Sequence, residues 1–205
     1  MGKSKLLFHM THIENLRSIL ENNGLSAYSE VATSGKPYRD IANAGIQDQR
    51  SGTSVPLPPY GDLHDYVPFY FAGCSPMLYK IKNSGIKQSE IVYLMTNTSK
   101  IHENGLPFVF TDGHAIMFLT EFYSSLDDID KVDWAIMKER YWGDTQDDPD
   151  RKRRRQAEFL VHRKVPLEQI IGIGVFDSEM KEEVEALLKS QRIDIPVGVR
   201  RHYYY

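Results

Sequence analysis

The sequence reads Leu6-Leu7-Phe8-His9-Met10-Thr11-His12-Ile13-Glu14 near its N-terminus, a stretch that predicts a strand running directly into a helix. Its first four residues, 6–9, are mostly the apolar and aromatic types that strands favour. Thr11 and Glu14 have the spacing of a capping box, in which a hydroxyl and a carboxylate satisfy the first free amides of a helix. Apolar residues then recur at helical spacing as far as Leu20, and Gly24 is placed to end the turn that follows.

The rest of the chain mixes the periods of strands and helices without a regular alternation. Strands are predicted at residues 66–71, 91–96, 107–110, 156–161, 170–176 and 195–199. Helices are predicted at residues 75–81, 114–123, 134–142 and 178–190, and residues 39–49 are a further helical candidate. No strand is followed by a Gly-x-Gly-x-x-Gly or P-loop pattern, so we expect an α+β fold and neither a Rossmann nor a P-loop domain.

The bulk composition is that of a folded globular protein. The chain has 205 residues, of which 41% are hydrophobic, and no Pro/Gly/Ser-rich linker divides it, so we expect a single domain over residues 1–205. The net charge of −3 argues against coating long duplex nucleic acid. A single cysteine, Cys74, excludes an internal disulfide and a cysteine zinc cluster, and no segment resembles a signal or a membrane span, so we expect a cytoplasmic protein.

Two local segments depart from this background. Residues 28–62, which include Arg50, are mostly irregular, and long irregular stretches in compact domains are typically lids or binding loops. The basic run Arg151-Lys152-Arg153-Arg154-Arg155 follows the acidic patch Asp147-Asp148-Pro149-Asp150. Such runs are often solvated faces, so any contact with nucleic acid would be local.

One carboxylate, Glu158, stands in the otherwise apolar segment Gln156-Ala157-Glu158-Phe159-Leu160. It could face solvent from a strand, or form an ion pair with Arg154 or Arg155. A carboxylate in a pocket could also accept hydrogen bonds from ribose hydroxyls and stabilise the oxocarbenium-like state formed as a glycosidic bond breaks. Nicotinamide is already a cationic leaving group in NAD, so one carboxylate would suffice for this chemistry.

Histidine, threonine and tyrosine side chains lie where predicted strands end. His9 and Thr11 could reach the nicotinamide ribose and amide, although a structural histidine and a helix cap explain them equally well. Tyr70 could stack on the nicotinamide ring, and His114 lies where a substrate loop could begin. No pair of histidines or carboxylates shows ligand spacing on a recognisable helix, so no metal site is expected.

The chain resembles the DarT family, the toxins of bacterial toxin–antitoxin pairs that ADP-ribosylate thymidine, or in a related branch guanosine, in single-stranded DNA. The resemblance covers nearly the whole chain. It rests on the segments Phe8-His9-Met10-Thr11-His12-Ile13-Glu14-Asn15-Leu16, Leu63-His64-Asp65-Tyr66-Val67-Pro68-Phe69-Tyr70-Phe71, Ser75-Pro76-Met77-Leu78, Pro107-Phe108-Val109-Phe110-Thr111-Asp112 and Arg155-Gln156-Ala157-Glu158-Phe159-Leu160.

The resemblance implies a compact ADP-ribosyltransferase fold of the PARP type, with an NAD cleft between two small mixed or antiparallel sheets and peripheral helices. The family's catalytic glutamate falls on Glu158 and its catalytic arginine on Arg50, and residues 39–53 become an element that covers NAD. NAD contacts are expected from His9, Met10, Thr11, Ser18, Gly24, Arg50, Tyr70 and Met77. DNA contacts are expected from His114, Arg151, Arg153, Arg154 and Arg155. Family members often carry basic residues around the arginine, whereas Gln49, Ser51 and Gly52 flank Arg50 here, so we expect DNA contacts in that loop to be weaker or differently placed.

The implied function is a toxin that transfers ADP-ribose from NAD, a co-substrate used without a metal, to thymidine in single-stranded DNA. The segment from Leu63 to Phe71 fits the thymidine branch better than the guanosine branch. The implied partners are single-stranded DNA and a macrodomain antitoxin similar to DarG, and we expect a monomer. Transfer to guanosine, RNA or protein, or a non-catalytic module that binds ADP-ribose or single-stranded DNA, are the alternatives.

The proton on thymine N3 must leave as the new bond forms. The family's arginine is described as the acceptor of this proton. A neutral guanidine is costly, so our hypothesis is that Arg50 stabilises the developing negative charge while the proton leaves by another route.

Overall fold

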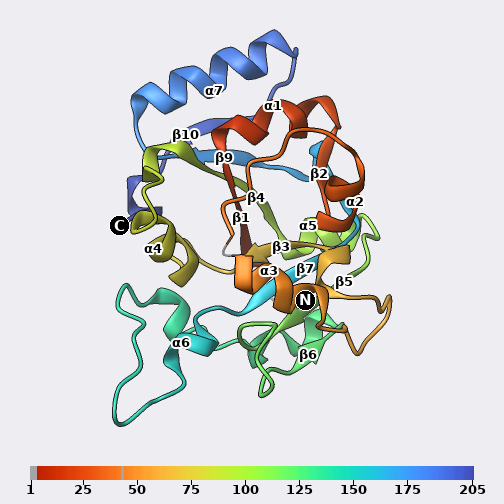
Figure 1. Ribbon diagram of the computed structural model, residues 1–205, viewed down its shortest axis with the longest axis vertical. Coiled ribbons are helices and arrows are strands. Elements are labelled where there is room, and N and C mark those ends of the chain that lie inside the picture. The colour runs from red at the N-terminus through yellow and green to blue at the C-terminus, as the bar shows by residue number, and fades with distance from the viewer. Residues whose placement is uncertain (1–3, 43) are drawn as a thin grey trace.

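The computed structural model describes residues 4–42 and 44–205. Within this part of the chain, ten strands and seven α-helices follow one another without a regular repeat (Figure 1). The strands are β1 Leu6–His12, β2 Gly24–Ser26, β3 Tyr66–Tyr70, β4 Ile91–Asn97, β5 Phe108–Thr111, β6 Phe122–Tyr123, β7 Glu158–His162, β8 Lys164–Pro166, β9 Gly172–Val175 and β10 Val197–Val199. The helices are α1 Ile13–Glu21, α2 Tyr28–Thr33, α3 Ala44–Ser51, α4 Pro76–Lys82, α5 Thr98–Glu103, α6 Arg151–Arg154 and α7 Ser178–Ser190. The α+β prediction is confirmed.

The large sheet is divided into two halves. Its strand order is β10-β9-β4-β1-β3-β7-β5-β6, and β2 pairs with β8 in a separate sheet. β10 is parallel to β9, whereas β1 is antiparallel to β4 and β3 is antiparallel to β7. In the middle, β1 and β3 share only the register pair of Phe8 with Tyr70. The halves β10-β9-β4-β1 and β3-β7-β5-β6 therefore meet at one point, and this is the form that the two expected small sheets take.

The parting of β1 from β3 has a cause in the sequence. Two residues beyond the pair of Phe8 with Tyr70, Met10 would face Pro68 across an antiparallel ladder. Proline has no amide hydrogen to donate, so the ladder cannot continue there. The Pro68 carbonyl instead lies 2.9 Å from Nδ1 of the His9 side chain. We call the place where the two strands separate the fork.

Strand alternation buries both faces of the β1–β4 half. Val92 and Leu94 of β4 belong to the largest apolar cluster, whereas Tyr93 and Met95 belong to a second cluster that also contains Phe8 of β1. Successive strand residues point to opposite faces, so two clusters on one strand pair mean that each face is covered. α1 and α7 supply residues to the first cluster and α4 to the second, and Figure 1 shows α1 and α7 together at one end of the molecule.

The first helix begins one residue later than a Thr11 cap requires. β1 extends through Thr11 to His12, and the His12 imidazole accepts the Glu14 amide hydrogen, so the predicted capping box is wrong. The Thr11 hydroxyl instead accepts a hydrogen bond from the Asn15 side chain.

Two predicted helices are absent from the described residues. The segment predicted as a helix at 114–123 is a loop that ends in β6, and the segment at 134–142 holds only the 3-10 turn Ile136–Lys138. Residues 116–119 are four consecutive apolar residues, which cannot all lie on one face of a helix. The helical candidate at 39–49 is shorter and later, because α3 covers Ala44–Ser51.

Other predictions of elements are confirmed with small shifts at their ends. The α7 prediction matches in full, and Ser75 caps α4 with Pro76 in its first turn. The sequence pattern missed α2, α5, α6 and the β2–β8 pair, all of which are short. No helix in the described part of the chain combines the length and apolar character that a membrane crossing needs.

The pairing of β2 with β8 requires glycine at position 24. Its φ of +134° is a conformation that other residues rarely adopt, and a Cβ there would lie 2.2 Å from the Val165 carbonyl oxygen. The conformation and the close approach both require glycine.

Gly24→Ala should therefore lower the free energy of unfolding by about 2–4 kcal/mol, the range for combined strain and clash. Gly105→Ala is the control, since Gly105 also has a positive φ of +66° but open space where the Cβ would lie. Urea unfolding measures both variants. Equal losses in the two would contradict the close approach of β2 to β8.

Candidate active site

Glu158 lies at the fork. It is the first residue of β7 and is in register with Tyr70, which is itself the partner of Phe8. Its side chain is buried, with 1% of the residue exposed. Arg50 Nη1 donates to Oε2 at 2.8 Å, and the Ala115 amide donates to Oε1 at 3.1 Å. Three segments that are distant in the sequence thus converge on one carboxylate.

The surroundings of Glu158 keep it ionised. Burial has the largest single effect and raises the pKa of this carboxyl, but the charge of Arg50, the contribution of His114 and the hydrogen bonds from Arg50 and Ala115 together outweigh it. The pKa of Glu158 is consequently lowered from its ordinary value. A buried carboxylate that stays charged at neutral pH can stabilise positive charge in the adjacent space.

Arg50 is only partly satisfied by this pair. The residue is 9% exposed, and its Nη2 is buried without a hydrogen-bond partner among the described residues. A guanidinium group carries five donors in a planar fork, so an unpaired donor in a buried place is available to an anionic or carbonyl group that enters the site.

The Arg50–Glu158 pair forms part of a pocket of about 380 Å³. His114 also lines it. The pocket brings together all the residues for which NAD contacts were predicted, namely His9, Met10, Thr11, Ser18, Gly24, Arg50, Tyr70 and Met77. Their roles toward NAD stay predictions, but their convergence in one cavity is a finding.

His9 lies on the β1 side of the pocket, just past the fork. A carbonyl oxygen only accepts, so Nδ1 carries the hydrogen toward Pro68 and Nε2 remains an acceptor. Burial lowers the pKa of His9 to about 4, although the hydrogen bond to Pro68 opposes the shift. A neutral imidazole at neutral pH can accept a hydrogen bond from a substrate amide or hydroxyl.

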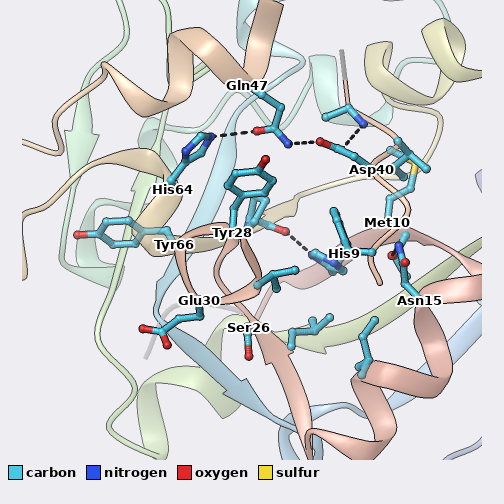
Figure 2. A pocket seen from close by; sticks show the side chains of 18 of the residues that line it. His9, Met10, Asn15, Ser26, Tyr28, Glu30, Asp40, Gln47, His64 and Tyr66 are labelled. Carbon is cyan, nitrogen blue, oxygen red and sulfur yellow. Dashed lines mark hydrogen bonds between the residues drawn. The ribbon is translucent and has the colours of Figure 1, made fainter. Parts of the chain in front are cut away.

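Another wall comes from the irregular segment and from His64 just after it, and it was not predicted residue by residue. Figure 2 shows His64, Gln47 and Asp40 in a hydrogen-bonded row, with Tyr28 beside them. His64 Nε2 lies 3.1 Å from Gln47 Oε1, and Gln47 Nε2 donates to Asp40 at 2.9 Å. The Tyr28 ring centroid is 4.4 Å from that of His64. His64 belongs to the Leu63–Phe71 segment that resembles the family, whereas the signal for the other three was the length of the irregular stretch, which predicted a binding loop.

Asn15 of α1 binds the irregular segment at Arg39 and holds it at the pocket. The Asn15 amide donates to the Arg39 carbonyl at 2.8 Å, and its oxygen accepts the Arg39 amide hydrogen at the same distance. This paired contact holds residues 37–42, most of which line the pocket, against α1. The expected covering element at 39–53 therefore borders the cavity through both an extended part and α3.

His114 lines the pocket beside Glu158. Its Nε2 is 4.0 Å from Glu158 Oε1, and neither ring nitrogen forms a hydrogen bond to a described residue. Burial lowers the pKa of His114, the charge of Glu158 opposes this shift, and Arg50 and Lys152 add to it. The imidazole is thus neutral at neutral pH and open to the cavity.

The basic run lies outside the pocket lining, and its arginines are engaged within the protein. Arg153 pairs with Asp112 and Asp150, at 3.0 and 2.8 Å. Arg154 pairs with Asp133 and Asp148. Arg155 is 2% exposed and donates to the Gly73 carbonyl at 2.6 Å, while Arg151 donates to the carbonyls of residues 141 and 143. These four residues hold segments of the fold together, which is a sufficient physical reason for their presence.

Across the described ranges, no three histidine, cysteine or carboxylate side chains gather in a group that could hold a metal ion. The functional groups that line the pocket are an ionised carboxylate, a guanidinium with a free donor, neutral imidazoles and tyrosines. A split sheet with this pair at the fork is the arrangement of an ADP-ribosyltransferase, the class that the sequence led us to expect.

Comparison with known proteins gives the family. A family profile described as "ssDNA thymidine ADP-ribosyltransferase, DarT" matches residues 8–205. The "DNA ADP-ribosyl transferase" of Thermus sp. (strain 2.9) is 38% identical, with 97% of this chain and 95% of the relative covered. This chain belongs to the DarT family of single-stranded DNA thymidine ADP-ribosyltransferases, which confirms the resemblance.

Solved structures agree with this assignment. The structure of Thermus sp. 2.9 DarT in complex with ADP-ribosylated ssDNA has a TM-score of 0.91 and 37% identity, covering 98% of this chain and 96% of that one. Its complex with NAD+ has a TM-score of 0.88 and 36% identity, covering 98% of each chain. A DNA ADP-ribosyl transferase–DNA ADP-ribosyl glycohydrolase fusion protein of Thermosipho africanus is 25% identical, covering 92% of this chain and 47% of the fusion.

The lowered pKa of His9 predicts how stability changes with acid. The native state resists protonation of His9 down to about pH 4, whereas an unfolded imidazole binds its proton near pH 6.5. Burial of neutral His9 therefore costs no stability above pH 6.5. As the pH falls from there toward 4, the free energy of unfolding decreases by up to about 3 kcal/mol.

His9→Asn keeps a side-chain donor for Pro68 and removes the titration. The free energy of unfolding, measured by denaturant titration between pH 4 and 7, should fall less steeply with acid in this variant than in the parent. Parallel curves would show that His9 is not held neutral by its burial.

Proposed function

We propose that this chain cleaves the bond between nicotinamide and ribose in NAD and transfers ADP-ribose to N3 of a thymidine base in single-stranded DNA. The observation that carries the proposal is the buried Arg50–Glu158 pair, whose Arg50 Nη2 lacks a partner among the described residues and which lies in a pocket lined by every residue expected to contact NAD. Membership of the DarT family supports the choice of DNA and thymidine.

Glu158 is assigned to the ribose of NAD. Its carboxylate can accept hydrogen bonds from ribose hydroxyls, and its charge stabilises the positive charge that develops at the anomeric carbon as the bond to nicotinamide weakens. The lowered pKa keeps this charge in place at neutral pH. The Ala115 amide fixes the direction of the carboxylate through Oε1.

Arg50 is assigned to the thymine. While Nη1 holds Glu158, Nη2 is free to donate to a thymine carbonyl oxygen. A carbonyl oxygen gains negative charge as N3 loses its proton, so this hydrogen bond strengthens as the reaction proceeds. Arg50 then stabilises the thyminate without giving up its own proton.

His114 is assigned as the acceptor of the N3 proton. It is neutral, lines the same pocket as Arg50 and makes no hydrogen bond to a described residue that would occupy its ring nitrogens. As the N3–carbon bond forms, the electron pair of the broken glycosidic bond goes to nicotinamide and the N3 proton goes to His114. The resulting imidazolium lies 4.0 Å from the Glu158 carboxylate, which stabilises it.

We further propose that the chain acts as a single-domain, monomeric toxin in the cytoplasm. N3 of thymine lies on the edge used for base pairing, so an ADP-ribose there blocks copying of the strand. A macrodomain antitoxin would remove the modification. The fusion of a transferase to a DNA ADP-ribosyl glycohydrolase in Thermosipho africanus supports a partner with that activity.

The assignment of Glu158 is tested with NAD and short oligonucleotides that differ only in base content, weighed after incubation. The parent should add one ADP-ribose to thymidine-containing strands alone. Glu158→Gln keeps a partner for Arg50 but removes the charge, and should lower the rate by about 100-fold or more. A gain in mass on guanosine strands, on RNA or on the protein itself would show that thymidine is not the substrate. Full activity of Glu158→Gln would contradict the assignment of Glu158 as the catalytic residue.

The assignment of His114 is tested by the pH dependence of transfer. The pKa of His114 is lowered, so the rate should be constant near neutrality and fall as the pH drops below the ordinary imidazole range. His114→Gln should lower the rate by about 100-fold or more. The remaining rate should no longer show this fall at low pH, which we call the acid limb of the profile.

His162→Gln serves as the matched control for this profile. The pKa of His162 is also lowered by burial, but the residue is not part of the pocket lining. The control should keep both the rate and the acid limb of the parent. An unchanged acid limb in His114→Gln would assign the proton to another group.

A further inference from the structure

An apolar tip projects from the loop between β5 and β6. Phe118 is 100% exposed, Leu119 73% and Met117 49%, whereas Ala115 at the start of the same turn is buried. We call residues 112–121 the tip loop. A single exposed apolar residue is ordinary, but three in succession with a fully exposed phenylalanine contribute nothing to the core and indicate a contact surface.

The tip loop is held in one shape by hydrogen bonds across its base. The His114 carbonyl accepts from the Met117 amide at 2.9 Å and from the Thr120 hydroxyl at 2.8 Å. Arg153 Nη1 donates to Asp112 at 3.0 Å and to Thr120 at 3.2 Å. Phe118 is thus presented to solvent by a braced turn, so little conformational freedom is lost when something binds it.

The base of the tip loop is part of the active site. His114 lines the pocket, and the Ala115 amide donates to Glu158. Phe118 lies four positions after His114, so their Cα atoms are at most about 14 Å apart. A strand that places one base beside His114 therefore runs within reach of Phe118.

We propose that Phe118 is a stacking platform for a base of the single-stranded DNA adjacent to the modified thymidine, with Met117 and Leu119 covering the edges of that base. The proposal rests on the proposed function for the identity of the ligand. An aromatic face stacks on any base, so this contact holds the strand without selecting its sequence. Continuity with the pocket that takes the thymidine favours DNA over a protein partner. A stable protein interface buries about 800 Å² on each side, far more than three side chains supply.

The test measures binding of a fluorescent single-thymidine oligonucleotide by anisotropy at fixed salt, so it does not depend on turnover. Phe118→Ala should raise the Kd by about 5- to 150-fold, the range for loss of one stacked base, and Phe118→Trp should bind as the parent does. Thermal unfolding should be unchanged in both variants, because the side chain is fully exposed.

A second oligonucleotide, in which the bases next to the thymidine are replaced by abasic sites, completes a double-mutant cycle. If Phe118 stacks on a neighbouring base, Phe118→Ala should have little effect on the Kd of this strand. An unchanged Kd on the intact strand, or an equal loss on both strands, would overturn the proposal. A change in oligomeric state with unchanged DNA binding would assign the tip to a protein contact instead.

Failure of the proposed function gives a separate signature. In that case the parent adds no mass to any oligonucleotide in the presence of NAD. The anisotropy cycle still reports whether Phe118 contacts a base.

Discussion

Past the pair of Phe8 with Tyr70, β1 and β3 stop sharing hydrogen bonds, because Pro68 has no amide hydrogen to continue the ladder. This single interruption opens the large sheet. It leaves the Pro68 carbonyl to be satisfied by the His9 side chain, which brings that imidazole to the pocket. Because Tyr70 is also in register with Glu158, the same point of the sheet places the carboxylate beside the opening. The position of the site follows from strand register and one proline.

The Arg50–Glu158 pair occupies this opening at a cost in stability. Two buried charges lose hydration, and their attraction repays this only when the remaining hydrogen-bonding groups are satisfied. Arg50 Nη2 has no partner in the described part of the chain, so the pair is incomplete as it stands. Such local departures from good packing are typical of functional sites, where a substrate supplies the missing partner. An apolar pair of similar size would suit the fold but could perform none of the proposed chemistry.

Sequence reasoning succeeded where the signal was local or long. The helix at residues 178–190 carries a full amphipathic period. Glu158 lies in a segment that resembles the family and Arg50 lies in the loop before another, and the structure brings the two together, although their catalytic roles stay predictions. It failed where partners are distant in the chain. Nothing near Arg153 indicates that Asp112 binds it, and the row formed by His64, Gln47 and Asp40 joins three positions without a shared pattern. The apolar run at 116–119 predicts a buried segment, whereas the exposure of residues 117–119 depends on tertiary contacts that the sequence pattern does not record.

The ion pairs of the basic run also bear on how DNA is held. Arg153 and Arg154 each bind carboxylates within the chain, and Arg155 is buried against backbone carbonyls, so the charge of these three is partly used inside the protein. The chain as a whole carries a net charge of −3, which disfavours binding driven by release of counterions. The proposed stacking of a base on Phe118 would add affinity that does not depend on this charge. Arg153 serves that end indirectly, because its bonds to Asp112 and Thr120 brace the loop that presents Phe118. The DNA contacts expected of Arg151, Arg153, Arg154 and Arg155 stay a prediction, and the bracing of the tip loop is a second role for Arg153.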